Sequence, residues 1–322
     1  MSRHLTQAVS FDSHGSRIAG VLYLPADHRE PWPCVVMAHG FSGTMDWIVP
    51  DFAAAFARGG LAVLIFDYRY TGSSEGEPRQ LVDSRRQQED LLSAVTFARA
   101  LRQVDPTRIA LWGTSLGGSH VVNLAAEDHA IAAVVANVPG LDLFVRGVKG
   151  RYVPPQSQLS RWTIARAGLS LLAAASLDAA RGMAGLSPHY IPVYGRLGHA
   201  VFSDPALAGL FRDVERNAPT WRNRVTPRFL FTAPRYRDGT MEKITAPLLA
   251  TVARDDEVVS SDFVKETVAK APRHVIREYP VQHFQMYHGA VRDAVVAEQL
   301  AFLQEHLLQG PGNGTDPTPI RA

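Results

Sequence analysis

The sequence is nearly free of cysteine, because Cys34 is the only one among 322 residues. A single thiol cannot close an intramolecular disulfide, so the fold must rest on its hydrophobic core and its hydrogen bonds. Cys34 lies in the apolar run 33–38, where a buried thiol behaves as a small hydrophobic group. A chain without disulfides is compatible with a reducing compartment, and we expect a cytoplasmic protein.

Long apolar stretches and an excess of one charge are missing as well. The longest apolar stretch, residues 167–177, is shorter than the roughly 20 residues that cross a bilayer. Residues 1–10 lack the apolar centre of a signal peptide. Lys and Arg number 33 and Asp and Glu 31, which leaves a net charge of +2. We therefore expect neither a membrane nor a nucleic acid as a partner.

The apolar residues that are present form short runs separated by helical patterns. Alternating residues around the turn at His14-Gly15 predict an antiparallel hairpin over residues 8–12 and 17–24. Runs that are apolar on both faces predict buried parallel strands at 34–38, 61–66, 108–112, 130–138, 247–252 and 274–279. Helical patterns occur at 84–101, 119–126 and 293–308. This alternation predicts the α/β class, with a mostly parallel, doubly wound sheet.

The alternation is interrupted once, between the strands predicted to end at residue 138 and to begin at residue 247. We expect helices at 159–180 and 204–217 in this region. Because the chain then returns to the sheet, we interpret residues 141–243 as an inserted, mainly helical cap. Residues 1–140 and 244–309 are then the core, and 310–322 a disordered tail.

The predicted cap is basic and carries many apolar side chains. It holds 15 Lys and Arg against 7 Asp and Glu. These charges form either a solvated helical face or a surface that attracts an anionic substrate or an acyl-carrier partner. We expect its apolar residues to pack the cap onto the sheet or to roof a substrate pocket. They include Trp162, Ile164, Leu169, Leu171, Leu172, Met183, Tyr190, Tyr194 and Phe202.

A short motif, G-T-S-L-G at residues 113–117, indicates nucleophilic catalysis. It follows a predicted strand and precedes a helical pattern, which is the context that a nucleophile elbow requires. The turn holds Ser115 in a strained conformation, and side chains larger than glycine at Gly113 and Gly117 would clash. The serine hydroxyl is thereby exposed at the carboxyl end of the sheet and the N-terminus of a helix.

A serine hydroxyl needs a base, and the base needs an acid that orients it. In this fold class the three residues occur in the order Ser, Asp or Glu, His. His283 follows the last predicted strand and is our base, with His288 as the nearby competitor. Asp256, after the strand at 247–252, is our acid. Its neighbour Asp255 and the earlier Asp142 remain alternatives.

The negative charge that develops on the substrate oxygen needs preorganised N–H donors. One is the backbone N–H of Leu116, directly after the nucleophile. The other is expected in the loop after the strand at 34–38, where His39-Gly40-Phe41 occurs. Gly40 lets the backbone turn inward, so the Phe41 N–H is the natural donor. His39 is interpreted as a brace of this loop.

Together these motifs resemble the dienelactone-hydrolase-like serine hydrolases of the α/β-hydrolase superfamily. The resemblance rests on residues 39–41, 66–69 with 72–80, 113–118, 255–256 and 283–284. It covers nearly the whole chain outside the predicted cap. It implies an α/β-hydrolase fold, a triad of Ser115, Asp256 and His283, and oxyanion donors at Phe41 and Leu116.

Some residues depart from the family pattern or serve it structurally. Dienelactone hydrolases proper use a cysteine nucleophile, so serine at position 115 argues against that activity. Gln282 stands where a glycine commonly precedes the catalytic histidine. Asp67 and Arg69 are interpreted as charges that brace the loop after their strand.

The sequence therefore predicts a serine hydrolase that cleaves an ester or thioester of a medium-sized, largely apolar acyl group through an acyl-enzyme. The same layout resembles fungal polyketide transferases, which pass the acyl group to an alcohol. A non-catalytic binding module on the same fold is the alternative of another class. Neither metal-ligand spacing nor a phosphate-binding glycine loop occurs, so we expect no cofactor and no metal. The expected partner is a small-molecule acyl substrate.

Overall fold

An eight-stranded sheet forms the centre of the molecule. A computed structural model describes residues 4–26, 30–153 and 159–308, so the predicted tail at 310–322 lies outside the described residues. The strands are β1 (His4–Ser13), β2 (Ser16–Pro25), β3 (Trp32–Ala38), β4 (Ala62–Phe66), β5 (Val104–Thr114), β6 (Ala133–Asn137), β7 (Leu248–Ala253) and β8 (His274–Tyr279). Their order in the sheet is β1-β2-β4-β3-β5-β6-β7-β8.

The sheet is antiparallel at one end and parallel elsewhere. β2 pairs with β1 and β4 in antiparallel fashion, and all other pairs are parallel. The predicted hairpin and the predicted parallel strands are thereby confirmed. The expectation of burial is wrong for β8, which lies at the edge of the sheet and has no buried residue. β6 is shorter than the predicted run 130–138, because residues 128–131 form a turn in which Asp128 accepts from the Ala130 N–H. The predicted α/β-hydrolase fold, with its mostly parallel sheet, is confirmed.

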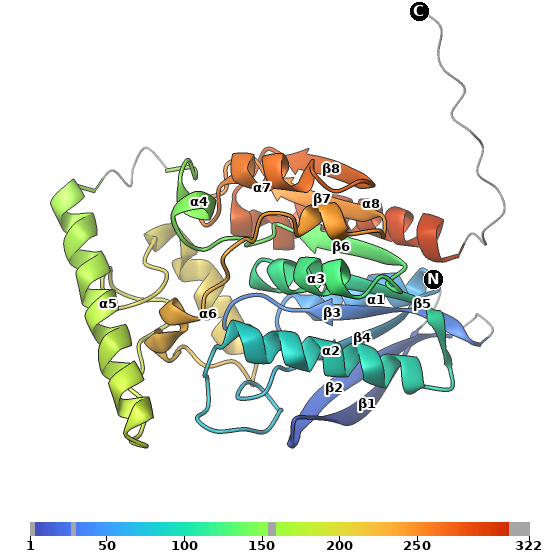
Figure 1. Cartoon of the computed structure of the whole chain (residues 1–322), viewed down its shortest axis with the longest axis horizontal. Coiled ribbons are helices and arrows are strands. Elements are labelled where there is room, and N and C mark those ends of the chain that lie inside the picture. The colour runs from blue at the N-terminus through green and yellow to red at the C-terminus, as the bar shows by residue number, and fades with distance from the viewer. Residues whose placement is uncertain (1–3, 27–29, 154–158, 309–322) are drawn as a thin grey trace, which may run out of the picture.

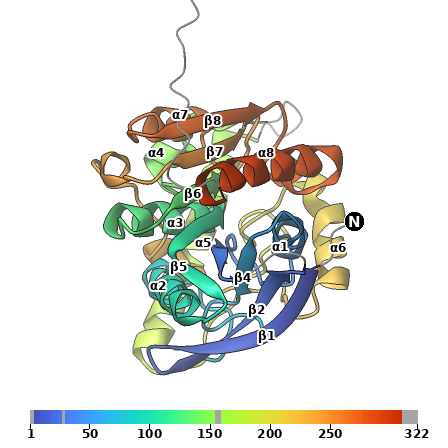
Figure 2. The same ribbon diagram turned by 90° about the vertical axis from the view of Figure 1, so that its right-hand side faces the viewer.

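Helices cover both faces of this sheet (Figures 1 and 2). The helices are α1 (Val49–Arg58), α2 (Ser84–Ala100), α3 (Leu116–Glu127), α4 (Val145–Val148), α5 (Arg161–Met183), α6 (Ala208–Asn217), α7 (Ser261–Val268) and α8 (Gly289–Leu307). Short 3₁₀ helices are η2 (Pro205–Leu207), η3 (Pro227–Phe231), η4 (Met241–Lys243) and η5 (His283–Tyr287). Residues of α1 and α8 share one core cluster, and those of α2, α3 and α7 share the other.

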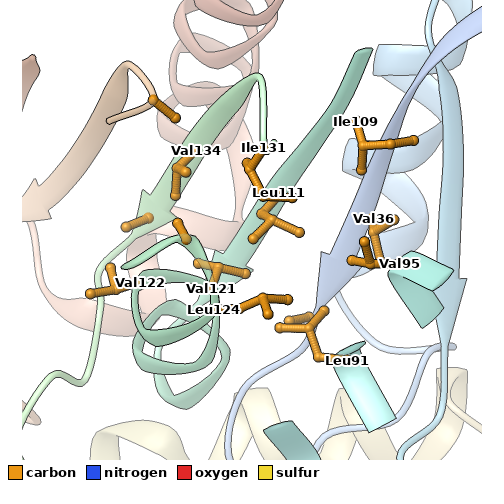
Figure 3. Packing of buried hydrophobic residues seen from close by; sticks show 14 of the residues in the cluster. Val36, Leu91, Val95, Ile109, Leu111, Val121, Val122, Leu124, Ile131 and Val134 are labelled. Atoms are coloured by element: carbon orange, nitrogen blue, oxygen red, sulfur yellow. The ribbon is translucent and has the colours of Figure 1, made fainter. Parts of the chain in front are cut away.

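The core beneath α2 and α3 fixes the central strands. Figure 3 shows Leu91 of α2 and Val121 of α3 packed with Leu111 of β5 and Val36 of β3. All four side chains are fully buried. Burying an aliphatic side chain of this size stabilises the fold by about 1.5–3 kcal/mol, so β3, β5 and α3 are held as one unit.

The region between β6 and β7, called the insertion below (residues 138–247), contains α4, α5 and α6. Several hydrogen bonds attach it to the loops at the carboxyl end of the sheet. Trp221 Nε1 donates to the Ser42 carbonyl, and Tyr190 OH donates to the Arg79 carbonyl. Phe211 and Val225 of the insertion share a buried cluster with Leu116. The insertion therefore lies over the site described below.

Helix α5 differs from the other long helices because it is largely exposed. Figure 1 shows it at the edge of the molecule, apart from the sheet. Only Ala175 and Asp178 of its 23 residues are buried. The expectation that its apolar residues pack the cap or roof a pocket is wrong for the exposed Trp162, Ile164, Leu169, Leu172 and Met183. Their helix contacts the body along one narrow side, so most of its surface meets no other part of the protein.

Candidate active site

Ser115 occupies the sharp turn between β5 and α3. Its backbone has φ 52° and ψ −118°, a strained conformation for a residue with a side chain. The Ser115 N–H donates to the Asn137 carbonyl at 2.9 Å, and the Ser115 carbonyl accepts from Gly118 and Gly140. These bonds hold the residue by its backbone and leave the side chain at the carboxyl end of the sheet.

Glycines surround Ser115 because the backbones pack too closely for any side chain. A Cβ added at Gly117 would lie 2.1 Å from the Ala38 carbonyl oxygen, and one at Gly113 would lie 2.2 Å from the Gly117 oxygen. A Cβ at Gly40 would come within 3.3 Å of the Ser115 Cβ. The motif glycines are therefore required for space, which also brings the loop after β3 against the serine.

Asp256 and His283 meet beside this turn. Asp256 Oδ1 accepts hydrogen bonds from the Val258 and Val259 N–H groups at 2.8 and 2.9 Å. Asp256 Oδ2 lies 2.7 Å from His283 Nδ1. Both side chains are buried. The carboxylate is fixed by two backbone donors, and it fixes the imidazole ring in turn, with Nδ1 as the protonated nitrogen.

Two carboxylates set the charge preference of His283. Burial lowers its pKa, but Asp256 beside the ring and Glu257 nearby outweigh this effect, and the pKa is raised above its usual value. The Glu257 carboxylate accepts from the His283 backbone N–H at 3.1 Å. Burial raises the pKa of Glu257 as well. The site therefore favours a positive charge on the imidazole when a proton arrives.

The alternative acids and the alternative base lie in other surroundings. Asp255 forms an ion pair with Arg254 at 2.9 Å. Asp142 accepts from the Phe144 N–H and the Tyr236 N–H and so braces the start of the insertion. His288 is exposed at the N-terminus of α8. Of the acids considered, Asp256 is the one hydrogen-bonded to the His283 ring.

The loop after β3 runs beside Ser115. His39 is buried, its Nδ1 lies 3.1 Å from the Gly40 carbonyl, and its ring packs edge-on against Tyr68. Burial lowers the pKa of His39 to about 4, so the ring is neutral at neutral pH. Phe41 lines the pocket described next. Leu116 is the first residue of α3, and its N–H has no intrahelical acceptor.

The predicted loop-bracing charges are engaged in ion pairs and hydrogen bonds. Asp67 Oδ1 accepts from the Met45 N–H and its Oδ2 from the Ser73 N–H, both at 2.7 Å. It therefore ties the loop after β3 to the loop after β4. Arg69 is buried and pairs with Asp90 at 2.7 Å. The interpretation of these two charges as braces is confirmed.

A small pocket joins the parts of the site. Its volume is about 30 Å³, which admits very few water molecules. Ser115 and His283 both line it, together with Val193 of the insertion. Five aromatic residues supply much of the remaining wall, and they are Phe41, Trp47, Phe202, Phe284 and Tyr287. Among the described residues no group of three or more His, Cys, Asp or Glu is arranged to hold a metal ion.

The sequence did not reveal the polar groups beneath the nucleophile. Tyr287 OH lies 2.7 Å from Thr114 Oγ1, which also accepts from Asn137 Nδ2. Gln299 of α8 donates to Asn137 Oδ1 and accepts from Trp112 Nε1. Thr114, Asn137 and Gln299 each lie in a mostly apolar stretch of sequence, and Glu257 is simply the residue after the predicted acid. No motif marks residues whose partners come from distant elements.

The chain is similar in sequence to known proteins. The family model described as "Serine aminopeptidase, S33" matches residues 29–293. A relative named "Quorum-quenching protein AidA", from Acinetobacter baumannii (strain MDR-ZJ06), is 35% identical over 298 residues. The match covers 92% of this chain and 93% of that protein.

Fungal proteins are similar over almost the same length. "Thiohydrolase aneE" from Aspergillus aculeatus is 27% identical, and the match covers 91% of each chain. The crystal structure of the α/β-hydrolase GrgF from Penicillium sp. sh18 superimposes with a TM-score of 0.76 and 25% identity. It covers 95% of this chain and 100% of GrgF. A polyketide transferase of the same name is 28% identical over 91% of this chain and 94% of its own.

Proposed function

Because the chain belongs to the serine aminopeptidase S33 family of α/β-hydrolases, we propose that it is a serine hydrolase acting on esters or thioesters of apolar acyl groups. One observation carries the proposal. Ser115 and His283 line the same pocket, and His283 Nδ1 is held at 2.7 Å by the buried Asp256. This arrangement supplies a nucleophile, a base and an orienting acid.

In the proposed reaction Ser115 Oγ attacks the acyl carbonyl carbon while its proton passes to His283 Nε2. The imidazolium is stabilised by Asp256, and it then gives the proton to the departing alcohol or thiol. Water enters next, loses a proton to His283 and attacks the acyl-enzyme. When the tetrahedral intermediate formed by this water collapses, His283 returns the proton to Ser115 Oγ and the carboxylic acid is released. The raised pKa of His283 suits a group that must hold a proton between the two transfers.

We assign the stabilisation of the tetrahedral intermediate to the backbone N–H groups of Phe41 and Leu116. Gly40 brings the first loop against Ser115, and Leu116 adds the positive end of α3. Loss of one such donor typically costs about 10²–10³ in kcat. Asp67 supports this assignment, because it ties the Phe41 loop to the neighbouring loop through the Met45 N–H.

The apolar, aromatic wall of the pocket favours an apolar acyl group. At about 30 Å³, however, the pocket is far smaller than the roughly 300–1,000 Å³ of typical ligand sites. A medium-sized acyl group requires Phe202 and Val193 of the insertion to move outward. We therefore propose that the insertion acts as a cap, and that its loop at 193–202 sets the length of the acyl group.

The identity of the acceptor separates two reactions. Relatives named thiohydrolase and polyketide transferase match equally long parts of the chain. The narrow, aromatic pocket would restrict water, which favours transfer to an alcohol that binds in its place. We keep acyl transfer as the second candidate on this observation.

Labelling tests whether Ser115 is a nucleophile, and product analysis tests whether water or an alcohol accepts the acyl group. A fluorophosphonate probe should modify Ser115 and leave Ser115→Ala unlabelled. Acyl p-nitrophenyl esters and acyl thioesters should then be compared, with free acid and transfer product measured as alcohol is added. Absence of labelling in the folded wild type would favour the non-catalytic binding module. Transfer product that exceeds free acid at low alcohol concentration would identify a transferase.

A further inference from the structure

Exposed apolar side chains gather on one part of the molecule. Of the 15 large hydrophobic residues exposed in the described chain, 12 lie between residues 152 and 231 of the insertion. Six of them belong to α5, and they are Trp162, Ile164, Leu169, Leu172, Leu177 and Met183. Trp162 is 86% exposed and Met183 85%. Monomeric soluble proteins rarely leave such a surface without a function.

Three exposed residues of α5 form a stripe bordered by arginine, whereas Ile164 lies on the opposite side of the helix. Trp162, Leu169 and Met183 are separated by multiples of seven residues, so they share one face of the helix. At about 100° per residue, Arg161 and Arg166 fall on either side of Leu169. Long arginine side chains in this position keep their charge in water while their stems follow the apolar surface.

This outward face carries no negative charge. The single acidic residue of α5 is Asp178, which is fully buried and paired with Arg228 at 2.6 Å. Arg161, Arg166 and Arg181 are therefore the charges that α5 presents around its stripe. A surface that is apolar in the middle and cationic along its borders complements an apolar phase beneath a layer of anions.

The attachment of α5 determines how it can meet such a phase. By length and composition the helix could cross a membrane, and only 11% of its most apolar stretch is buried in the protein. Ala175 and Asp178 are buried, and Asp178 also accepts from the His189 N–H. Upstream of the helix, the Tyr152 backbone N–H donates to the Asp256 carbonyl at 2.9 Å. Because the contacts of Ala175 and Asp178 hold the second half of α5 against the body, α5 is placed to lie in an interface and not to span it.

We propose that α5 docks the protein onto a membrane surface rich in anionic lipid, with the Trp162–Leu169–Met183 stripe in the headgroup layer. This departs from our expectation from the sequence that no membrane is involved, and it does not depend on the proposed hydrolysis. A second copy fits less well, since pairing two α5 helices would bring arginine against arginine. A rigid protein partner would need a deep groove for this protruding helix (Figure 1), whereas a fluid headgroup layer adapts to it.

Sedimentation with lipid vesicles tests the proposal on the full chain. The vesicles contain phosphatidylcholine alone or with about one-third phosphatidylglycerol. Wild type should bind the anionic vesicles at least about tenfold more strongly, and binding should weaken as salt rises to about 0.5 M. Trp162→Asp with Leu169→Asp should lose at least tenfold in binding. The matched control is Leu5→Asp with Leu92→Asp, which alters exposed leucines of β1 and α2, outside the insertion.

Charge and oligomeric state are checked in the same series. Arg161→Glu with Arg166→Glu should lose binding, whereas Arg85→Glu with Arg102→Glu should not. Circular dichroism and turnover of a soluble ester should stay unchanged in the α5 variants, which separates this inference from the proposed function. Failure of wild type to bind anionic vesicles, or equal losses in test and control variants, would overturn it. So would light scattering that shows a dimer dissolved by Trp162→Asp with Leu169→Asp.

Discussion

Helices α3 and α5 are both rich in apolar residues, yet α3 is almost entirely buried and α5 is largely exposed. Ten of the 12 residues of α3 are buried, against two of the 23 of α5. α3 packs against β5 and β6 beside α2, and Ser115 lies at its N-terminus. α5 contacts the body along one side. The core therefore determines the position of one helix, whereas the other is left available to its surroundings.

This difference separates two kinds of residue. Groups on the α3 side are held by backbone contacts so close that no Cβ would fit, as at Gly117. Groups of the insertion meet the site through side chains such as Phe202. We expect changes on the first side to abolish activity or stability, and changes on the second to alter selectivity.

The largest effect is expected at Ser115. Ser115→Ala should lower ester turnover by about 10⁴-fold or more, because triad residues act as a unit. The thermal midpoint should change little, since the backbone bonds of residue 115 remain. Initial rates at equal protein purity provide the measurement, and turnover within tenfold of wild type would refute the assignment.

The second-largest effect is expected for Asp256→Asn, which should lower kcat by about 10³–10⁴-fold. The amide cannot hold the imidazole in the required tautomer. Asp255→Asn is the matched control, because Asp255 pairs with Arg254 at the surface, and we expect less than about threefold loss there. Equal losses in the two variants would contradict the choice of acid.

The two helices can be compared directly through their glycines. Gly117→Ala in α3 should destabilise the protein by about 2–4 kcal/mol, because its Cβ would meet the Ala38 carbonyl at 2.1 Å. Gly168→Ala in α5 meets nothing within 4 Å and should stabilise by about 0.5–1 kcal/mol. Denaturant midpoints measure both. Destabilisation at Gly168 would show that α5 is packed more closely than described.

Activity should rise with pH through the ionisation of His283, which must be neutral to accept the serine proton. Because its pKa is raised, the midpoint in kcat/KM should lie above about 6.5, with a tenfold fall per unit below it. Protonated His283 also stabilises the fold below the unfolded pKa, and this contribution is lost as pH rises through the folded pKa. His288→Gln serves as the control with an unchanged profile. A flat profile from about pH 5 to 8 would exclude a histidine base.

The smallest effect is expected in the insertion. Phe202→Ala should enlarge the pocket and shift the preferred p-nitrophenyl ester to a longer acyl chain. Each methylene newly buried adds about 0.8 kcal/mol, or roughly fourfold in kcat/KM. The rate on the acetate ester should stay within a few fold of wild type. An unchanged chain-length profile would remove Phe202 from the proposed role.

The sequence predicted the sheet better than the helices around it. Buried strands such as β7 are apolar on both faces, and few other structures share that pattern. Helices α1 and α7 were not predicted, although α1 carries Asp51 in its first turn and Gly59 after its last. Each of these end signals is a single residue. Helix α1 has 10 residues, which is close to the minimum length at which a helical periodicity can be recognised.

The candidate site was predictable where the chain order constrains it. The motif around Ser115 and the required sequence of acid and base identified residues that the structure brings to one edge of the sheet. Contacts such as Gln299 with Asn137 join residues 162 positions apart, and no local pattern encodes them. The exposure of α5 was equally unpredictable, because an apolar helix has the same sequence pattern whether protein or lipid covers it.

The turn at residue 115 has a chemical consequence. It holds that residue through the backbone, by the Asn137 carbonyl and the N–H groups of Gly118 and Gly140. None of these bonds involves the side-chain oxygen. The fold therefore separates the placement of the nucleophile from its chemical nature. The same three backbone bonds would hold a cysteine at this position, so the placement of the nucleophile does not depend on whether the reacting atom is oxygen or sulfur.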